Sequence, residues 1–100
     1  MNLELTIKRK WFDMIADGVK KEEYRRDSRW IMSRLLRLES DGNFHDVHYD
    51  AVRFRNGYSK DSPIVMCKYL GWKYGYGNPE WGGERHPGFQ LIVIKLGALI

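Results

Sequence analysis

The chain has 100 residues and carries 17 Lys and Arg against 13 Asp and Glu, a formal net charge of +4. This length fits one domain with one modest hydrophobic core and excludes two. Hydrophobic residues at 43% and charged residues at 30% exclude a disordered chain, and the basic excess is compatible with a phosphate-bearing partner.

The first quarter of the sequence predicts a strand, a helix and an extended segment. Apolar and polar residues alternate from Leu3 to Lys8, which is typical of a strand with one buried face. Lys10–Asp17 places apolar residues at helical spacing, and Gly18 stands where a helix C-cap is expected. The charged segment Val19–Arg25 is expected to be extended.

A second helix and a second strand are predicted before the middle of the chain. Asp27–Ser28 is an N-cap signal, and the helix after it is expected to run to about Glu39. One face of this helix is apolar, through Ile31, Leu35 and Leu38. Ser40–Asp46 is typical of a loop. Ala51–Arg55 alternates as a strand, with the turn signal Asn56–Gly57 after it.

The C-terminal part predicts two more strands separated by a long loop. Ile64–Leu70 and Phe89–Leu96 are apolar enough to lie inside a sheet. Gly71–Gly88, rich in Gly, Tyr and Trp, is expected to be a loop, and a loop of that length is either mobile or functional. Several strands with few helices predict an α+β fold, either a small β-barrel or a curled mixed sheet with two helices.

The densest chemical signal is the segment Gly18–Arg25, which fits the pattern G-x-K-x-x-E-x-R. Glu23 and Arg25 are two residues apart, so in a strand they share a face, where the carboxylate can orient the guanidinium toward a phosphate or a base edge. Lys20 joins them only if the chain turns or bulges after Gly18. A lysine buried there has a lowered pKa and can act as a base. The alternative is a solvated strand with weak surface ion pairs.

This motif resembles the signature of the ASCH family, which belongs to the PUA-like superfamily of RNA-associated β-barrels. Further blocks resemble small phage and bacterial members of the family: Lys8–Phe12, Phe54–Tyr58, Pro79–Gly82 and Ile92–Gly97. The resemblance implies a single ASCH domain over residues 1–100. It also implies a PUA-like barrel of about five to six strands with about two flanking helices, whose partner is RNA or a modified nucleoside.

The resemblance further implies a metal-independent hydrolase, either like the N4-acetylcytidine amidohydrolases or like the ribonucleases of the family. Lys20 is then the base or electrostatic stabiliser, Glu23 the positioning carboxylate or proton acceptor, and Arg25 the anion clamp. In the small amidohydrolases a Thr stands three residues after the motif Lys, where this sequence has Glu23. The alternatives are a noncatalytic RNA-binding module and a protein-interaction adaptor that uses the basic second helix.

Other residues are candidates for binding RNA or a nucleoside. Tyr24 lies inside the motif, and Arg55, Asn56 and Tyr58 surround the predicted turn, where they can contact a base or phosphate or serve only the turn. Aromatic residues crowd the long loop: Trp72, Tyr74, Tyr76 and Trp81. Such rings provide stacking surfaces for bases or close one end of a barrel, and Trp81 is the strongest stacking candidate.

We expect neither a metal nor a cofactor. His45 and His48 are three residues apart without a convincing third ligand, and His86 is isolated. Cys67, the single cysteine, lies in an apolar run and is expected to be a core residue rather than a nucleophile. No apolar run reaches the roughly 20 residues of a membrane helix, and no signal peptide is recognisable. The sequence therefore predicts a cytoplasmic protein and leaves the oligomeric state open.

Overall fold

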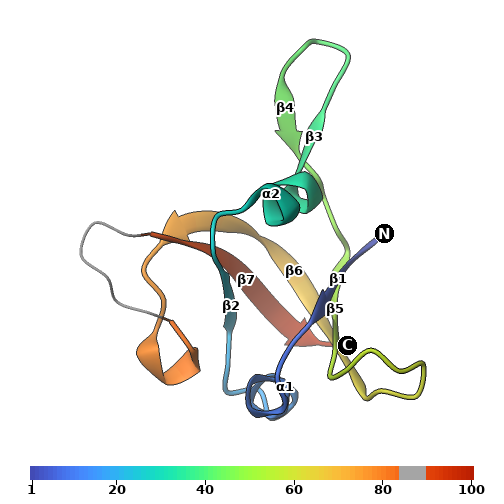
Figure 1. Cartoon of the computed structure of the whole chain (residues 1–100), viewed down its shortest axis with the longest axis vertical. Coiled ribbons are helices and arrows are strands. Elements are labelled where there is room, and N and C mark those ends of the chain that lie inside the picture. The colour runs from blue at the N-terminus through green and yellow to red at the C-terminus, as the bar shows by residue number, and fades with distance from the viewer. Residues whose placement is uncertain (84–89) are drawn as a thin grey trace.

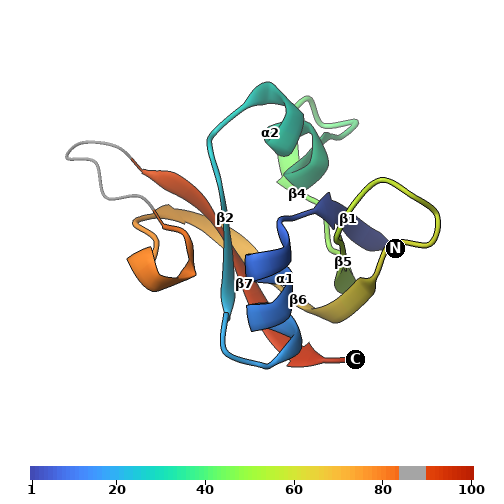
Figure 2. The same ribbon diagram turned by 60° about the horizontal axis from the view of Figure 1, so that its bottom comes forward.

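A curled, mixed sheet of five strands forms the centre of the fold in the computed structural model, which describes residues 1–83 and 90–100 (Figure 1). In spatial order its strands are β1 (Asn2–Thr6), β5 (Ala51–Arg55), β6 (Ile64–Gly75), β7 (Leu91–Leu99) and β2 (Glu22–Arg25). Only the β1–β5 pair is parallel. The sheet bends into a half-barrel (Figure 2), and its two edge strands are β1 and β2.

Alternation along β1 and β5 correctly predicted which side chains enter the core. Leu3 and Leu5 are almost fully buried, as are Val52 and Phe54 on the neighbouring strand. Cys67 on β6 is also in the core, where burial raises the pKa of its thiol to about 11. The prediction that this cysteine serves as a small core residue is therefore confirmed.

Two helices accompany the sheet, and one lies between the two edge strands. Helix α1 (Arg9–Ala16) follows β1 directly and buries Phe12 and Ile15. In both views it lies between β1 and β2 (Figures 1 and 2). Helix α2 (Arg29–Leu35) begins at the predicted N-cap, where the hydroxyl of Ser28 accepts a hydrogen bond from the Ile31 amide at 3.2 Å.

The second helix is shorter than the sequence predicted. It ends at Leu35, and the chain continues as the hairpin of β3 (Leu36–Leu38) and β4 (Phe44–Asp46), where a helix end and a loop were expected. Leu38, predicted to face the core, is 59% exposed. The overlooked signal is Asp41–Gly42: Gly42 adopts φ +82°, and the Asp41 carboxylate accepts from the Asn43 amide, which is hairpin-turn chemistry.

The predicted strand that ends at Leu70 in fact continues to Gly75. Gly71 was interpreted as the start of a loop, but it lies in a bulge at φ +98°, where the register between β6 and β7 shifts. Glycine in a strand often marks such a bulge rather than an end. Strand β7 runs on past the predicted end at Leu96, and its predicted start at Phe89 lies outside the described residues.

Neither helix combines the length and the apolar character needed to cross a lipid bilayer, as far as residues 1–83 and 90–100 are concerned.

Replacing Phe54 tests the position of the core. Phe54→Ala removes a ring that is 0% exposed, and we expect the free energy of unfolding to fall by about 3–5 kcal/mol. The matched control is Phe44→Ala on the hairpin, where the ring is 66% exposed and a change within about 0.5 kcal/mol is expected. Urea unfolding measures both; equal losses would contradict this description of the core.

Candidate functional site

The bend after α1 brings Lys20 into the interior. Gly18 adopts φ +76°, a conformation that favours glycine, and the amides of Val19 and Lys20 both donate to the Met14 carbonyl at 2.9 and 3.0 Å. The chain therefore reverses within a few residues. Lys20 was expected to join Glu23 and Arg25 only if the chain turned after Gly18, and this turn is present.

Two cationic side chains of the motif, Lys20 and Arg25, converge on the carboxylate of Glu23. Glu23 Oε1 lies 3.4 Å from Lys20 Nζ, and Glu23 Oε2 lies 2.9 Å from both Nε and Nη2 of Arg25. The side chains of Lys20 and Glu23 are 1% and 7% exposed, so this cluster is not a solvated surface strand. The predicted convergence is confirmed, while the catalytic roles stay predictions.

Burial sets the electrostatics of this cluster. Removal from water lowers the pKa of Lys20, and the neighbouring Glu23 carboxylate opposes that shift. The ammonium also lies 4.7 Å from the centre of the Tyr24 ring and 5.5 Å from that of Trp11, within cation–π range. Lys20 is thus held by one anion, two rings and the carbonyl of Trp81, to which it donates at 2.7 Å.

Arg25 connects the two edges of the half-barrel. Its Nη2 donates to the Thr6 carbonyl at 2.9 Å, at the end of β1. β1 and β2 are opposite edges of the sheet and do not pair through their backbones. The Arg25 side chain therefore spans the gap between them. Glu23 fixes the orientation of the guanidinium from the other side.

The segment around the short 3-10 helix η1 (Pro79–Trp81) packs directly onto the rings of the site. The Tyr24 hydroxyl donates to Glu22 at 2.6 Å and accepts from the Asn78 amide at 2.9 Å. Burial and the Glu22 contact raise the pKa of Tyr24, so its phenol stays protonated at neutral pH. A Cβ at Gly82 would lie 2.9 Å from the Trp11 ring, and φ there is +90°, so glycine is required for this approach.

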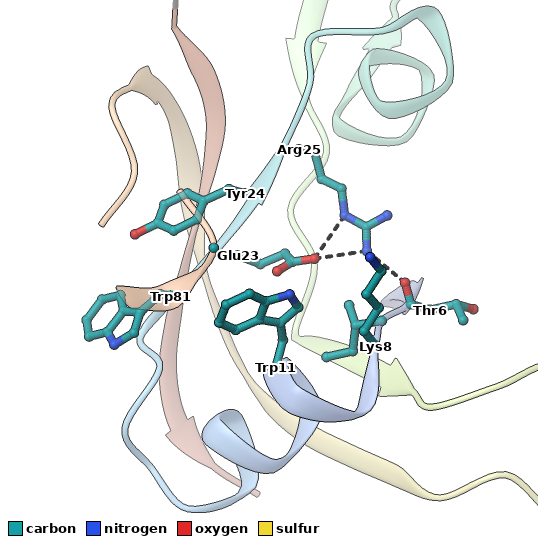
Figure 3. Close-up of a pocket in the computed structure, with 9 residues that line it drawn as sticks. Thr6, Lys8, Trp11, Glu23, Tyr24, Arg25 and Trp81 are labelled. Carbon is teal, nitrogen blue, oxygen red and sulfur yellow. Dashed lines mark hydrogen bonds and ion pairs between the residues drawn. The ribbon is translucent and has the colours of Figure 1, made fainter. Parts of the chain in front are cut away.

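These contacts leave a pocket of about 280 Å³ beside α1, in the gap between β1 and β2 (Figure 3). Its lining combines rings with charged and polar groups: Thr6, Ile7, Lys8, Trp11, Glu23, Tyr24, Arg25, Trp81 and Gly82. In Figure 3, Glu23 and Arg25 extend from β2 toward Thr6 and Lys8, with the Trp11 ring beside Glu23. Lys20 contacts Glu23 but is itself buried and is not part of the lining.

Sequence reasoning placed Tyr24 and Trp81 at this site and missed Thr6, Lys8 and Trp11. Thr6 has no local signal, because it contributes through its backbone carbonyl. Lys8 and Trp11 are three residues apart at the start of α1, a spacing that places two side chains on the same side of a helix. This spacing was the available signal that both belong to one surface.

Three predicted binding residues lie elsewhere. Arg55 donates to the Ser59 carbonyl at 2.8 Å, and the Asn56 side chain donates to the Ile7 carbonyl at 3.0 Å. Tyr58 is 92% exposed. None of the three lines the pocket. Arg55 and Asn56 are occupied in holding the turn after β5, which is the structural alternative that the sequence left open, and their binding role stays a prediction.

The other aromatic residues of the expected loop belong mainly to β6. Trp72 donates to Asp46 at 3.0 Å, and Tyr74 donates to Asp27 at 3.2 Å. The two rings pack edge to face, with centres 5.3 Å apart, while Tyr76 is 56% exposed. They form a separate group that does not line the pocket beside α1.

No three His, Cys, Asp or Glu side chains gather into a possible metal site within residues 1–83 and 90–100. His45 contacts the Asp41 carboxylate at 2.7 Å, and His86 lies outside the described residues. Comparison of the chain with protein-family models, with curated proteins and with solved structures gave no significant match.

Glu23→Gln tests the charge cluster. The variant leaves the buried Lys20 ammonium without its anion, so we expect the free energy of unfolding at neutral pH to fall by about 3 kcal/mol. Lys20 binds its proton more weakly in the folded than in the unfolded chain. The charged Lys20 side chain therefore lowers the free energy of unfolding. This destabilisation is complete below the pKa of Lys20 in the folded chain and disappears as the pH rises toward the ordinary lysine pKa of 10.5.

The difference between Glu23→Gln and wild type should therefore shrink at alkaline pH, as measured by urea unfolding at neutral pH and near the ordinary lysine pKa. Glu39→Gln changes an exposed glutamate in the same way and should have almost no effect at either pH. A loss for Glu23→Gln that is independent of pH would refute the role assigned to Lys20.

Proposed function

We propose that the pocket beside α1 binds a nucleoside, either a free modified nucleoside or one unit of an RNA strand, in an ASCH-type domain of PUA-like fold. The observation that carries the proposal is the lining itself. Trp11, Tyr24 and Trp81 offer aromatic surface to a base, while Lys8 and Arg25 offer positive charge to a phosphate or an oxyanion.

The resemblance to the ASCH signature supports the same function independently of the pocket. The Lys, Glu and Arg of the pattern are the residues that converge at this site, and Gly18 provides the bend that allows it. If these charged residues served only a solvated strand, Glu23 would not need to be buried between two cations, as it is here.

For the chemistry, we propose metal-independent hydrolysis with Glu23 as the proton acceptor. Glu23 lines the pocket, and the contact of its Oε1 with Lys20 is long at 3.4 Å, so this oxygen retains acceptor capacity. With N4-acetylcytidine, water attacks the acetyl carbonyl, Glu23 takes the water proton, and Arg25 stabilises the oxyanion. The carbon–nitrogen bond then breaks, N4 receives the proton, and cytidine is released with acetic acid, which loses its proton to solvent and becomes acetate.

On an RNA strand, the same carboxylate takes the proton of a ribose 2′-hydroxyl, which attacks the adjacent phosphorus. The bond from phosphorus to the 5′-oxygen breaks, and that oxygen receives the proton. Both reactions need only the carboxylate as acceptor and a cation beside the developing negative charge.

A second candidate is a noncatalytic RNA-binding module, and one observation favours it. Lys20 is engaged by the Trp81 carbonyl and by Glu23 and does not reach the pocket surface, while Arg25 is engaged by Glu23 and Thr6. In this candidate the charged cluster organises the pocket walls, and the rings carry the binding.

Substrate assays with a chelator present separate the two candidates. The protein is incubated with N4-acetylcytidine and, separately, with single-stranded RNA, and products are followed by chromatography. Product formed by wild type and lost in Glu23→Gln supports hydrolysis, provided that the variant is folded. Binding without product supports the module, and binding of neither ligand overturns both in favour of a protein-interaction adaptor.

The role of Lys8 in binding is tested with a matched pair of lysine variants. Lys8→Gln removes an exposed positive charge at the pocket and should weaken binding of a short single-stranded RNA by about tenfold, with a smaller salt dependence. Lys60→Gln makes the same change on the exposed turn after β5 and should leave affinity almost unchanged. Calorimetric titration measures both, and equal effects would place binding elsewhere.

A further inference from the structure

A second cavity, of about 350 Å³, lies between the segment that follows β4 and the bulged part of β6. It shares no lining residue with the pocket beside α1. Its wall contains three phenol and indole rings, one imidazole and one carboxylate, from Tyr49, Tyr69, Trp72, His48 and Asp46. The volume is in the range of small-molecule sites, which begins at about 300 Å³.

The bulge in β6 places two of these rings on one wall. Tyr69 pairs with Leu96 and Trp72 with Ile94, so β6 advances three residues where β7 advances two. In a regular strand, residues three apart face opposite sides of the sheet. The extra residue, with Gly71 at φ +98°, resets this alternation, and both rings line the same cavity.

The polar groups of the cavity have unused capacity. Trp72 Nε1 donates to Asp46 Oδ1 at 3.0 Å, and Oδ2 has no hydrogen bond or ion pair among the residues described. The Tyr69 hydroxyl is buried and also lacks a partner there. Burial and the nearby Asp46 carboxylate raise the pKa of Tyr69 to about 12, so the phenol stays protonated at neutral pH.

The rings of Tyr49 and Tyr69 form two walls of the cavity that stand at nearly a right angle. Tyr49 and Tyr69 meet edge to face, with centres 5.4 Å apart and planes at 84°. The Tyr49 hydroxyl donates to the Arg34 carbonyl at 2.5 Å, which fixes this wall to the end of α2. Three exposed arginines lie in this helix and in the strand after it, β3: Arg29, Arg34 and Arg37. Aromatic walls, with positive charge on the neighbouring helix and strand, fit a base that is attached to phosphates.

We propose that this second cavity binds a further base of a single-stranded RNA, so that the ligand of the protein is a strand rather than a free nucleoside. The inference rests on the function proposed above and defines its substrate class. Asp46 accepts hydrogen bonds and so favours the N4 amino group of cytosine over the O4 carbonyl of uracil, which would face the carboxylate with another acceptor.

The experiment compares oligocytidylate with oligouridylate of the same short length, each with a fluorescent label, by anisotropy titration. Wild type is expected to bind oligocytidylate about tenfold more tightly. Asp46→Asn retains an oxygen that can accept from Trp72 but removes the charge, and its affinities for the two strands should become nearly equal. Asp61→Asn, the same change at an exposed turn, should retain the wild-type preference.

Free cytidine, titrated by calorimetry, separates this inference from the function on which it rests. Asp46→Asn should still bind one cytidine per chain in the pocket beside α1, because Asp46 does not line that pocket. If wild type binds cytidine but shows no preference between the strands, or if Asp46→Asn keeps the preference while folded, the second base site is refuted and the first stands. If neither cytidine nor RNA binds, the proposed function fails and the second site with it.

Discussion

The buried carboxylate of Glu23 is the interaction on which the site depends. Moving a carboxylate out of water costs several kcal/mol, and here two cations, Lys20 and Arg25, offset that cost at 3.4 and 2.9 Å. Each cation then reaches a backbone carbonyl of a distant segment, Trp81 for the lysine and Thr6 for the arginine. One ion cluster therefore joins β2, the edge strand β1 and the segment around η1.

The same contacts that stabilise the half-barrel also form the pocket. Because β1 and β2 are not paired by backbone hydrogen bonds, a gap remains between them, and α1 lies beside it (Figures 1 and 2). Among the residues that the structure describes, no strand fills this gap; the Arg25 side chain crosses it and donates to the Thr6 carbonyl. The ion cluster that joins the edges of the half-barrel therefore also supplies side chains of the pocket wall, Glu23 and Arg25.

Two glycines set the backbone conformation next to the ion cluster and in the wall of the second cavity. Gly18 ends α1 with a bend that brings Lys20 inward, and Gly71 introduces the bulge that turns Tyr69 and Trp72 toward one wall. Both residues adopt positive φ, which a side chain with a Cβ makes costly. The position of Lys20 in the ion cluster, and of two rings in the second cavity, therefore depends on backbone conformation at these two glycines.

Local spacing in the sequence was sufficient for β1, α1, β5 and the N-cap of α2. It also placed Glu23 and Arg25 on one strand face, and it made the approach of Lys20 depend on a bend after Gly18. These features depend on neighbours a few residues apart. Only the tertiary structure decided the others, because they depend on pairing between distant strands. At Gly71, where a loop was predicted to begin, the β6–β7 register makes a bulge instead. The edges of the half-barrel brought Thr6, Lys8 and Trp11 to the pocket and left Arg55, Asn56 and Tyr58 outside its lining.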